Sequence, residues 1–161
     1  MSLTTRIQAI KDNLNQSQQY LNTILEQVDN RWETPVYSDG AAWNVRQLLI
    51  HLSVADKGML GQIQRIVAGE EGVPEDFDLE RYNRRSVEKR ETMTVEEARA
   101  AIENAHQEIL QWLDNIEDES VLDLEGRHGS LNIMTIEQIL IIIGNHKRDH
   151  AKDIAKALNI E

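Results

Sequence analysis

The stretch IIIGNHKRDHAKDI, residues 141–154, places two histidines on a helical face that is otherwise apolar. His146 follows Ile143 by three residues, His150 follows His146 by four, and Ile154 continues the same spacing. Because side chains three and four residues apart share one face of an α-helix, all four point toward the expected protein core. The spacing therefore predicts an amphipathic helix that carries two imidazoles inward.

Three further segments, residues 4–31, 44–69 and 94–116, repeat this helical spacing of apolar side chains. Three of the four predicted helices also begin with a residue pair typical of a capping box, in which side chains bind the free backbone N–H groups of the first turn. These pairs are Asn44 with Gln47, Thr94 with Glu97, and Thr135 with Gln138.

The connection between the second and third helices, residues 69–93, is too long for a tight hairpin. Its charged part, residues 79–89, permits a short helix of its own. Residues 125–130, EGRHGS, are typical of a turn, and no strand-like alternation is recognised in the chain. We therefore predict one all-α domain over residues 1–161, a four-helix bundle with a long crossover between helices two and three.

The composition excludes several classes of function. With 17 Lys and Arg against 28 Asp and Glu, the formal net charge is -11, which argues against binding to nucleic acids or acidic membranes. The chain has no cysteine, so disulfides, thiolate metal sites and a cysteine nucleophile are excluded. Any sulfur chemistry would need a thiol on the substrate. The lack of a long apolar segment predicts a cytoplasmic protein.

A third histidine, His51, lies on or beside the inner face of the second helix. At about 1.5 Å per residue, it is roughly 10 Å from the start of its helix, and His150 is about 12 Å from the end of the last helix. If the two helices run antiparallel with level ends, the imidazoles of His51, His146 and His150 meet. Burying an unpaired polar ring costs about 1–3 kcal/mol, so each ring needs a hydrogen bond or a metal.

Three inward histidines with no acidic ligand would leave an open coordination position, as in catalytic metal sites. Imidazole nitrogens suit zinc, nickel or ferrous iron, and do not suit calcium or magnesium. We therefore predict one divalent transition metal per chain at His51, His146 and His150. The alternative, that these are core histidines satisfied by hydrogen bonds, stays open at this point.

Two other metal motifs do not fit the sequence. Lys147 stands where a zincin carries its catalytic glutamate. A ferritin-like di-iron site needs two Glu-x-x-His pairs on helices. Glu103 with His106 forms one such pair, but Glu125 with His128 falls in the glycine turn. We interpret His106 and His128 as surface or boundary histidines.

Four segments resemble the DinB/YfiT-like superfamily of metal-binding four-helix bundles, particularly relatives of mycothiol-dependent maleylpyruvate isomerase. They are WNVRQLLIHL (43–52), HKRDH (146–150), FDLERYN (77–83) and RWETPVYSDG (31–40). The resemblance covers nearly the whole chain. It departs at Asn44, where members commonly have Ser or Thr, but Asn also caps helices.

The resemblance implies an up-down-down-up bundle, a divalent metal held by the three histidines, and a homodimer. Some relatives use the metal to activate a low-molecular-weight thiol for transfer or isomerisation, and others resemble metal-dependent hydrolases. We therefore expect a metal-dependent thiol S-transferase or hydrolase acting on a small molecule. The alternatives are a non-catalytic metal-binding or dimeric interaction module and a plain helical dimerisation domain.

Residues outside the triad receive weaker predictions. Tyr82, Asn83 and Arg84 in the crossover are candidate substrate contacts if this segment folds over the bundle end, although a solvated helix face explains them equally well. Asp149 is a candidate acceptor for a metal-binding histidine, but its position favours solvent. Trp43 is expected to be a packing residue where the second helix begins.

Overall fold

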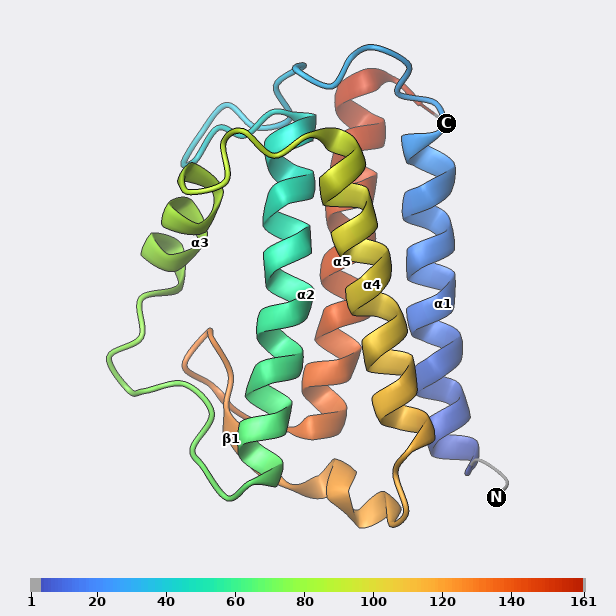
Figure 1. The fold of residues 1–161 in the computed structure, drawn as a ribbon, viewed down its shortest axis with the longest axis vertical. Coiled ribbons are helices and arrows are strands. Elements are labelled where there is room, and N and C mark those ends of the chain that lie inside the picture. Colours follow the sequence, from blue (N-terminus) through green and yellow to red (C-terminus); the bar gives the residue numbers. More distant parts are fainter. Residues whose placement is uncertain (1–3, 161) are drawn as a thin grey trace.

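The computed structural model describes residues 4–160. Four long helices form the bundle and α3 lies outside it against α2, as Figure 1 shows, so the predicted all-α four-helix bundle is confirmed. In chain order the elements are α1 (Thr5–Leu25), α2 (Val45–Val67), α3 (Leu79–Glu88), α4 (Val95–Asp114), a 3-10 helix η1 (Glu119–Asp123), β1 (Glu125–Arg127), β2 (Ile133–Thr135) and α5 (Ile136–Leu158).

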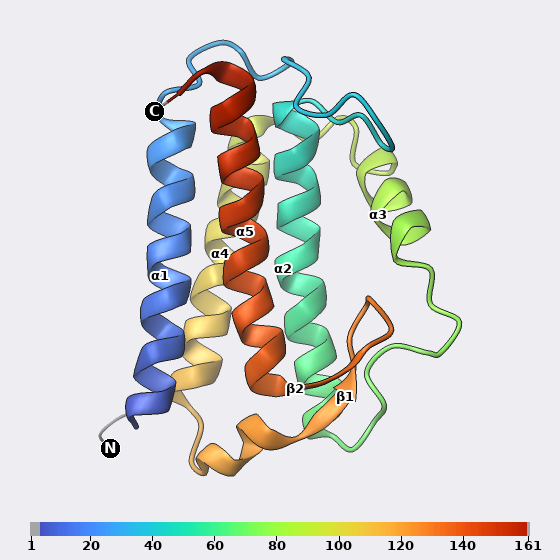
Figure 2. The same ribbon diagram turned by 180° about the vertical axis from the view of Figure 1, so that it is seen from behind.

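The helices follow the up-down-down-up order that the family resemblance implied (Figures 1 and 2). The chain returns through α3 to the end of the bundle where α2 began, so α4 runs parallel to α2, and α5 runs parallel to α1. The packed pairs include α1 with α5, α2 with α4, and α2 with α5. Because α2 and α5 are antiparallel neighbours, the middle of one faces the middle of the other.

All three predicted capping boxes form, and they fix where α2, α4 and α5 begin. In each box the cap side chain accepts a hydrogen bond from the backbone N–H three residues on, and the Gln or Glu at that position accepts one in return. By fixing where α2 and α5 begin, these local bonds determine how far along the bundle axis each side chain of the two helices lies.

The first helix ends at Leu25 and not near residue 31, which corrects the sequence-based boundary. The residues after it form tight turns, and Asp29 has a positive φ of 60°. Val28 remains completely buried in this turn region, so its apolar side chain follows the expected spacing without continuing the helix.

Residues 125–130 were predicted to form a turn, but the first three of them form a short β-strand. Glu125 to Arg127 pair antiparallel with Ile133 to Thr135, and strands of three residues are too short to show alternation in the sequence. The hairpin packs closely on α2, because a side chain on Gly126 would begin 2.3 Å from Ile66 Cγ1. None of the helices described over residues 4–160 has the length and apolarity needed to span a membrane.

The core consists of two clusters of buried apolar side chains, one toward each end of the bundle. A layer of buried polar side chains lies between them at mid-height, where the four helices carry polar residues at inward positions. This polar layer comprises Ser17, Gln18, Asp56, His106 and Lys147. The candidate site lies at the same height.

Candidate metal centre

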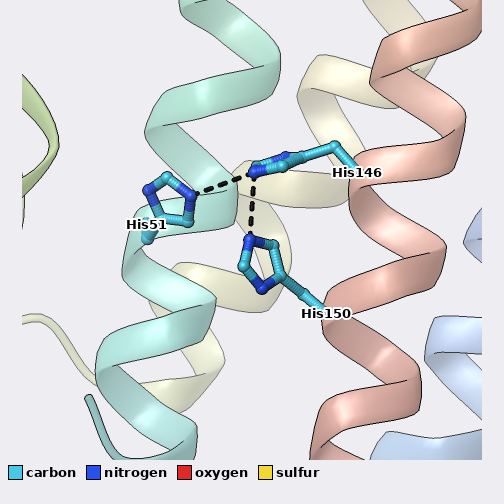
Figure 3. Close-up of side chains that lie close together, drawn as sticks. All are labelled: His51, His146 and His150. Carbon is cyan, nitrogen blue, oxygen red and sulfur yellow. Dashed lines mark hydrogen bonds between the residues drawn. The ribbon is translucent and has the colours of Figure 1, made fainter. Parts of the chain in front are cut away.

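His51 from α2 and His146 and His150 from α5 point toward one another, as Figure 3 shows. The Nε2 atom of His146 lies 3.2 Å from Nε2 of His51 and 3.0 Å from Nε2 of His150. The three candidate ligand atoms all lie within 4.8 Å of one another. The structure therefore brings together the three histidines that the sequence singled out.

These distances fit a shared metal ion. Ligands held about 2.05 Å from a tetrahedral ion are about 3.3 Å apart, close to the two short contacts. These three residues would hold an ion through three imidazole nitrogens and would leave room for a further ligand. The residues present therefore fit a divalent transition metal such as zinc, nickel or ferrous iron.

The tautomer of His150 is fixed by an outer chain of hydrogen bonds. The Tyr37 hydroxyl lies 2.7 Å from His150 Nδ1 and donates its proton to Asp153 Oδ2. Since the phenol has one proton, His150 Nδ1–H must donate to the Tyr37 oxygen. The Nε2 atom of His150 then carries a lone pair that faces the other two rings, as a metal ligand requires.

Direct hydrogen bonding among the three rings is a poorer explanation of the cluster. With a lone pair on His150 Nε2, only a proton on His146 Nε2 can bridge the 3.0 Å contact. That same proton cannot also bridge the 3.2 Å contact to His51 in good geometry. A cation accepts all three lone pairs at once.

The rings are neutral at neutral pH. Burial disfavours the imidazolium form and, with the neighbouring histidines, lowers the pKa of His51 to about 3 and that of His150 to about 4. Burial also lowers the pKa of His146, although the nearby carboxylates of Asp56 and Asp149 act in the opposite direction. Neutral imidazole is the form that binds metals, so no ligand proton has to be displaced near pH 7.

The sequence did not single out Tyr37 or Asp153. Asp149, the acceptor considered from the sequence, is exposed, whereas Asp153 one turn later reaches Tyr37. Burial and the Asp153 carboxylate raise the pKa of Tyr37 well above its ordinary value, so the phenol keeps its proton. The only sequence signal was the spacing of Asp153, three residues after a candidate ligand.

Trp43 packs as predicted, at the start of α2 against the apolar cluster there. Its indole also stacks on the imidazole of His51, with ring centroids 4.7 Å apart and planes inclined by 30°. The indole therefore restrains the orientation of a candidate ligand.

A pocket of about 100 Å³ lies beside the histidines and includes His51 and His146 in its wall. Tyr82 and Asn83 from α3 also line it, whereas Arg84 is exposed and does not. The rest of the wall is mostly apolar and is supplied by α2, the crossover, α5 and the hairpin loop. These remaining wall residues are Ala55, Gly58, Met59, Gln62, Phe77, Leu79, His128, Gly129 and Ile142.

The interpretation of His106 and His128 as surface or boundary residues is wrong. Both are buried, with 4 % and 8 % of their surface exposed. His106 lies in the polar layer, where its Nε2 is 3.0 Å from Asn15 Oδ1. The hairpin loop carries His128 into the pocket wall. Neither belongs to the three-histidine cluster.

Comparison with known proteins agrees with this fold. A family model described as the DinB superfamily matches residues 13–154. Among solved structures, the chain is similar to YfiT from Bacillus subtilis, described as a probable metal-dependent hydrolase with an unusual four-helix bundle topology. The TM-score is 0.74 at 19% identity, over 98% of this chain and 89% of that one, a likeness that shows the fold. No curated protein sequence matches the chain significantly.

Proposed function

This chain belongs to the DinB superfamily, and from that premise we propose that it is a metal-dependent enzyme whose ion is held by His51, His146 and His150. The single observation that carries the proposal is the convergence of three imidazole nitrogens beside a pocket. The description of YfiT as a probable metal-dependent hydrolase supports the same class of chemistry.

A bound divalent ion would supply positive charge that lowers the pKa of a water ligand to about 7 and favours thiolate over thiol in the same way. The three neutral imidazoles leave that charge uncompensated. Tyr37 and Asp153 hold His150 in its metal-binding tautomer, and Trp43 restrains the ring of His51.

The pocket would bind the substrate electrophile next to the reacting nucleophile. Its wall is mostly apolar, and Tyr82 and Asn83 are the wall residues that we propose as substrate contacts. A water nucleophile would make the protein a hydrolase. A low-molecular-weight thiol would make it an S-transferase or isomerase, and in a chain without cysteine the thiol would arrive as a cosubstrate.

Metal content is the first test. Elemental analysis of the purified protein should find one zinc, nickel or iron ion per chain, and His51→Ala, His146→Ala and His150→Ala should each lose stoichiometric metal. His106→Gln is the control, because this buried histidine lies outside the cluster and should leave the metal content unchanged. Retention of one ion per chain in all three alanine variants would overturn the site assignment.

Turnover is the second test. The metal-loaded protein should hydrolyse small esters or amides, or conjugate electrophiles with mycothiol, bacillithiol or glutathione, and a chelator should abolish the activity. The substrates on which activity appears identify the nucleophile. A stoichiometric metal without turnover on any of these substrates would instead support a non-catalytic metal-binding module.

A further inference from the structure

His128 is a buried residue of the pocket wall that lies outside the three-histidine cluster. The hairpin loop carries it, and 8 % of its surface is exposed. This loop packs on the crossover, because a side chain on Gly129 would begin 3.2 Å from Leu79 Cδ1 and 3.7 Å from Phe77 Cε2. The loop and the crossover therefore form one side of the pocket together, and that contact holds His128 in place.

Two donors in the loop itself fix the tautomer of His128. The backbone N–H of Ser130 donates to Nδ1 at 3.1 Å, and the Ser130 hydroxyl lies 2.9 Å from the same atom. A backbone N–H can only donate, so Nδ1 carries the lone pair and the ring proton is on Nε2. Burial and the neighbouring His146 lower the pKa of His128, so the ring is neutral near pH 7.

The Nε2–H group of His128 is open to a ligand. It makes no hydrogen bond with any group among residues 4–160. The unpartnered ring nitrogens of His106 and His146 are completely enclosed, whereas Nε2 of His128 is not among the enclosed atoms without a partner. Nε2 therefore keeps accessible surface, on a side chain that is otherwise buried and lines the pocket.

The pocket brings this donor close to the histidine cluster. His51 and His146 belong to the same wall. The volume of about 100 Å³ is smaller than an engineered cavity of about 150 Å³ that binds benzene, so a functional group that fills it is within reach of both His128 and the candidate ligands. Most of the remaining wall is apolar, and a hydrogen bond is stronger in such surroundings than in water.

We propose that His128 is a catalytic residue whose Nε2–H donates a hydrogen bond to the carbonyl oxygen of the substrate, which makes the substrate a small carbonyl compound such as an ester. This inference rests on the proposed function and names the substrate class of that site. A neutral imidazole that donates to an oxygen on which negative charge develops lowers the energy of the transition state.

The proton of His128 stays on Nε2 throughout the reaction. The nucleophile reacts as hydroxide or thiolate, after its proton has left to solvent. Its lone pair forms the new bond to the carbonyl carbon, and the π electron pair of the C=O bond moves to the oxygen that His128 binds. When the adduct collapses, this pair returns to the C=O bond, and the leaving group departs as an anion that takes a proton from water.

Butanone and its methylene isostere, in which a CH₂ group replaces the carbonyl oxygen, are matched probes for the hydrogen bond. In zinc-reconstituted protein with isotopically labelled histidine, NMR observes the ring nitrogens of His128 through the carbon-bound ring protons. The free protein should carry the ring proton on Nε2. Butanone should then shift the Nε2 resonance, and the isostere should leave it nearly in place while both probes shift the Gly129 amide.

His128 also offers a matched pair of variants. His128→Asn retains an acceptor for Ser130 N–H but removes the pocket donor, so butanone should bind about tenfold more weakly and the isostere should bind unchanged. His128→Gln places an amide donor near the position of Nε2 and should restore part of the affinity. Circular dichroism establishes that each variant is folded, and elemental analysis should still find one zinc ion per chain.

Turnover of p-nitrophenyl acetate supplies a kinetic readout. His128→Asn should lower kcat about 10²–10³-fold with a smaller change in KM, because the charge on the oxygen is larger in the transition state than in the bound ester. His128→Gln should recover part of kcat. A residue that only holds the loop in place would give no such difference between the two variants.

A ring proton on Nδ1, an Nε2 resonance that does not respond to butanone, or an equal response to the isostere would overturn the proposal. Undiminished kcat in His128→Asn would overturn it as well. Failure of the proposed function gives a different result, because the protein would then lack metal or turnover while the Nε2 resonance of His128 still responded to butanone alone.

Discussion

Lys147 Nζ lies 2.8 Å from Asp56 Oδ2 inside the bundle, and 1 % or less of either residue is exposed. The ammonium group also donates to Gln18 Oε1 at 2.7 Å. Lys147 follows His146 directly, and the charge of Asp56 acts on the pKa of His146. The ion pair therefore joins α2 to α5 beside the candidate metal centre and helps to fix the height at which His146 faces His51.

Breaking this pair should destabilise the protein strongly. Lys147→Met leaves the Asp56 carboxylate buried without a counter-charge, which should lower the free energy of unfolding by about 3–5 kcal/mol. The double variant Asp56→Leu with Lys147→Met removes both charges. Its free energy of unfolding should lie within about 1 kcal/mol of that of the natural protein. Urea unfolding followed by circular dichroism measures both. A single variant no less stable than the double would show that the pair does not hold the polar layer.

Local signals made most of the fold predictable. The capping pairs at Asn44, Thr94 and Thr135 depend on residues three apart, so the starts of α2, α4 and α5 could be predicted. The end of α1 could not, because Val28 is buried by tertiary contacts outside the helix. The short hairpin was missed because the structure pairs its strands across a loop whose sequence is typical of a turn.

In the candidate site too, residues with a local sequence signal could be predicted and the others could not. His146 and His150 were identified from helical spacing, and His51 from its distance along an antiparallel partner. Tyr37 comes from the loop before α2, and the path of that loop decides whether its hydroxyl reaches α5. Lys147 is a residue type that is rarely buried without a partner, and its partner Asp56 lies 91 residues earlier in the chain, so no local pattern indicated its position.

Tyr37→Phe should weaken metal binding without removing it. Loss of the hydroxyl leaves His150 Nδ1–H without its acceptor, and removing such outer partners typically costs about 10–100-fold in metal affinity. Competition with a zinc-binding dye measures the dissociation constant. Asp153→Ala should act in the same direction, and Asp149→Ala, one turn earlier and exposed, is its matched control. Equal losses at Asp149 and Asp153 would indicate a general charge effect and not a positioning role.

The metal-free protein should lose stability as the pH falls below about 6.5. Burial lowers the pKa of His51 from 6.5 to about 3 and that of His150 to about 4, so the unfolded chain binds these protons at a higher pH than the folded one. The stabilisation is complete above pH 6.5 and decreases by at most about 1.4 kcal/mol per pH unit for each histidine between pH 6.5 and about 4.

Urea unfolding of chelator-treated protein at pH 7.5, 6.0 and 5.0 measures how the free energy of unfolding changes with pH. These values lie above the range in which most carboxylates titrate. Replacing His51 with Gln removes one titrating group and should flatten the slope by the contribution of that group. An unfolding free energy that is constant over this range would mean that the histidines bind protons equally in both states.

Gly72→Ala should destabilise the contact between the crossover and the hairpin. Gly72 has a φ of 93°, and an added Cβ would lie 2.3 Å from the backbone oxygen of Arg127, which cannot move as a side chain can. Backbone strain of this kind alone costs about 1–3 kcal/mol. Gly69→Ala is a matched control, because Gly69 has a φ of 91° but open space around the added atom. Urea unfolding should therefore show a larger loss of stability for Gly72→Ala than for Gly69→Ala. Equal losses in the two variants would mean that strain alone accounts for the effect and that the close approach to Arg127 does not hold the hairpin in place.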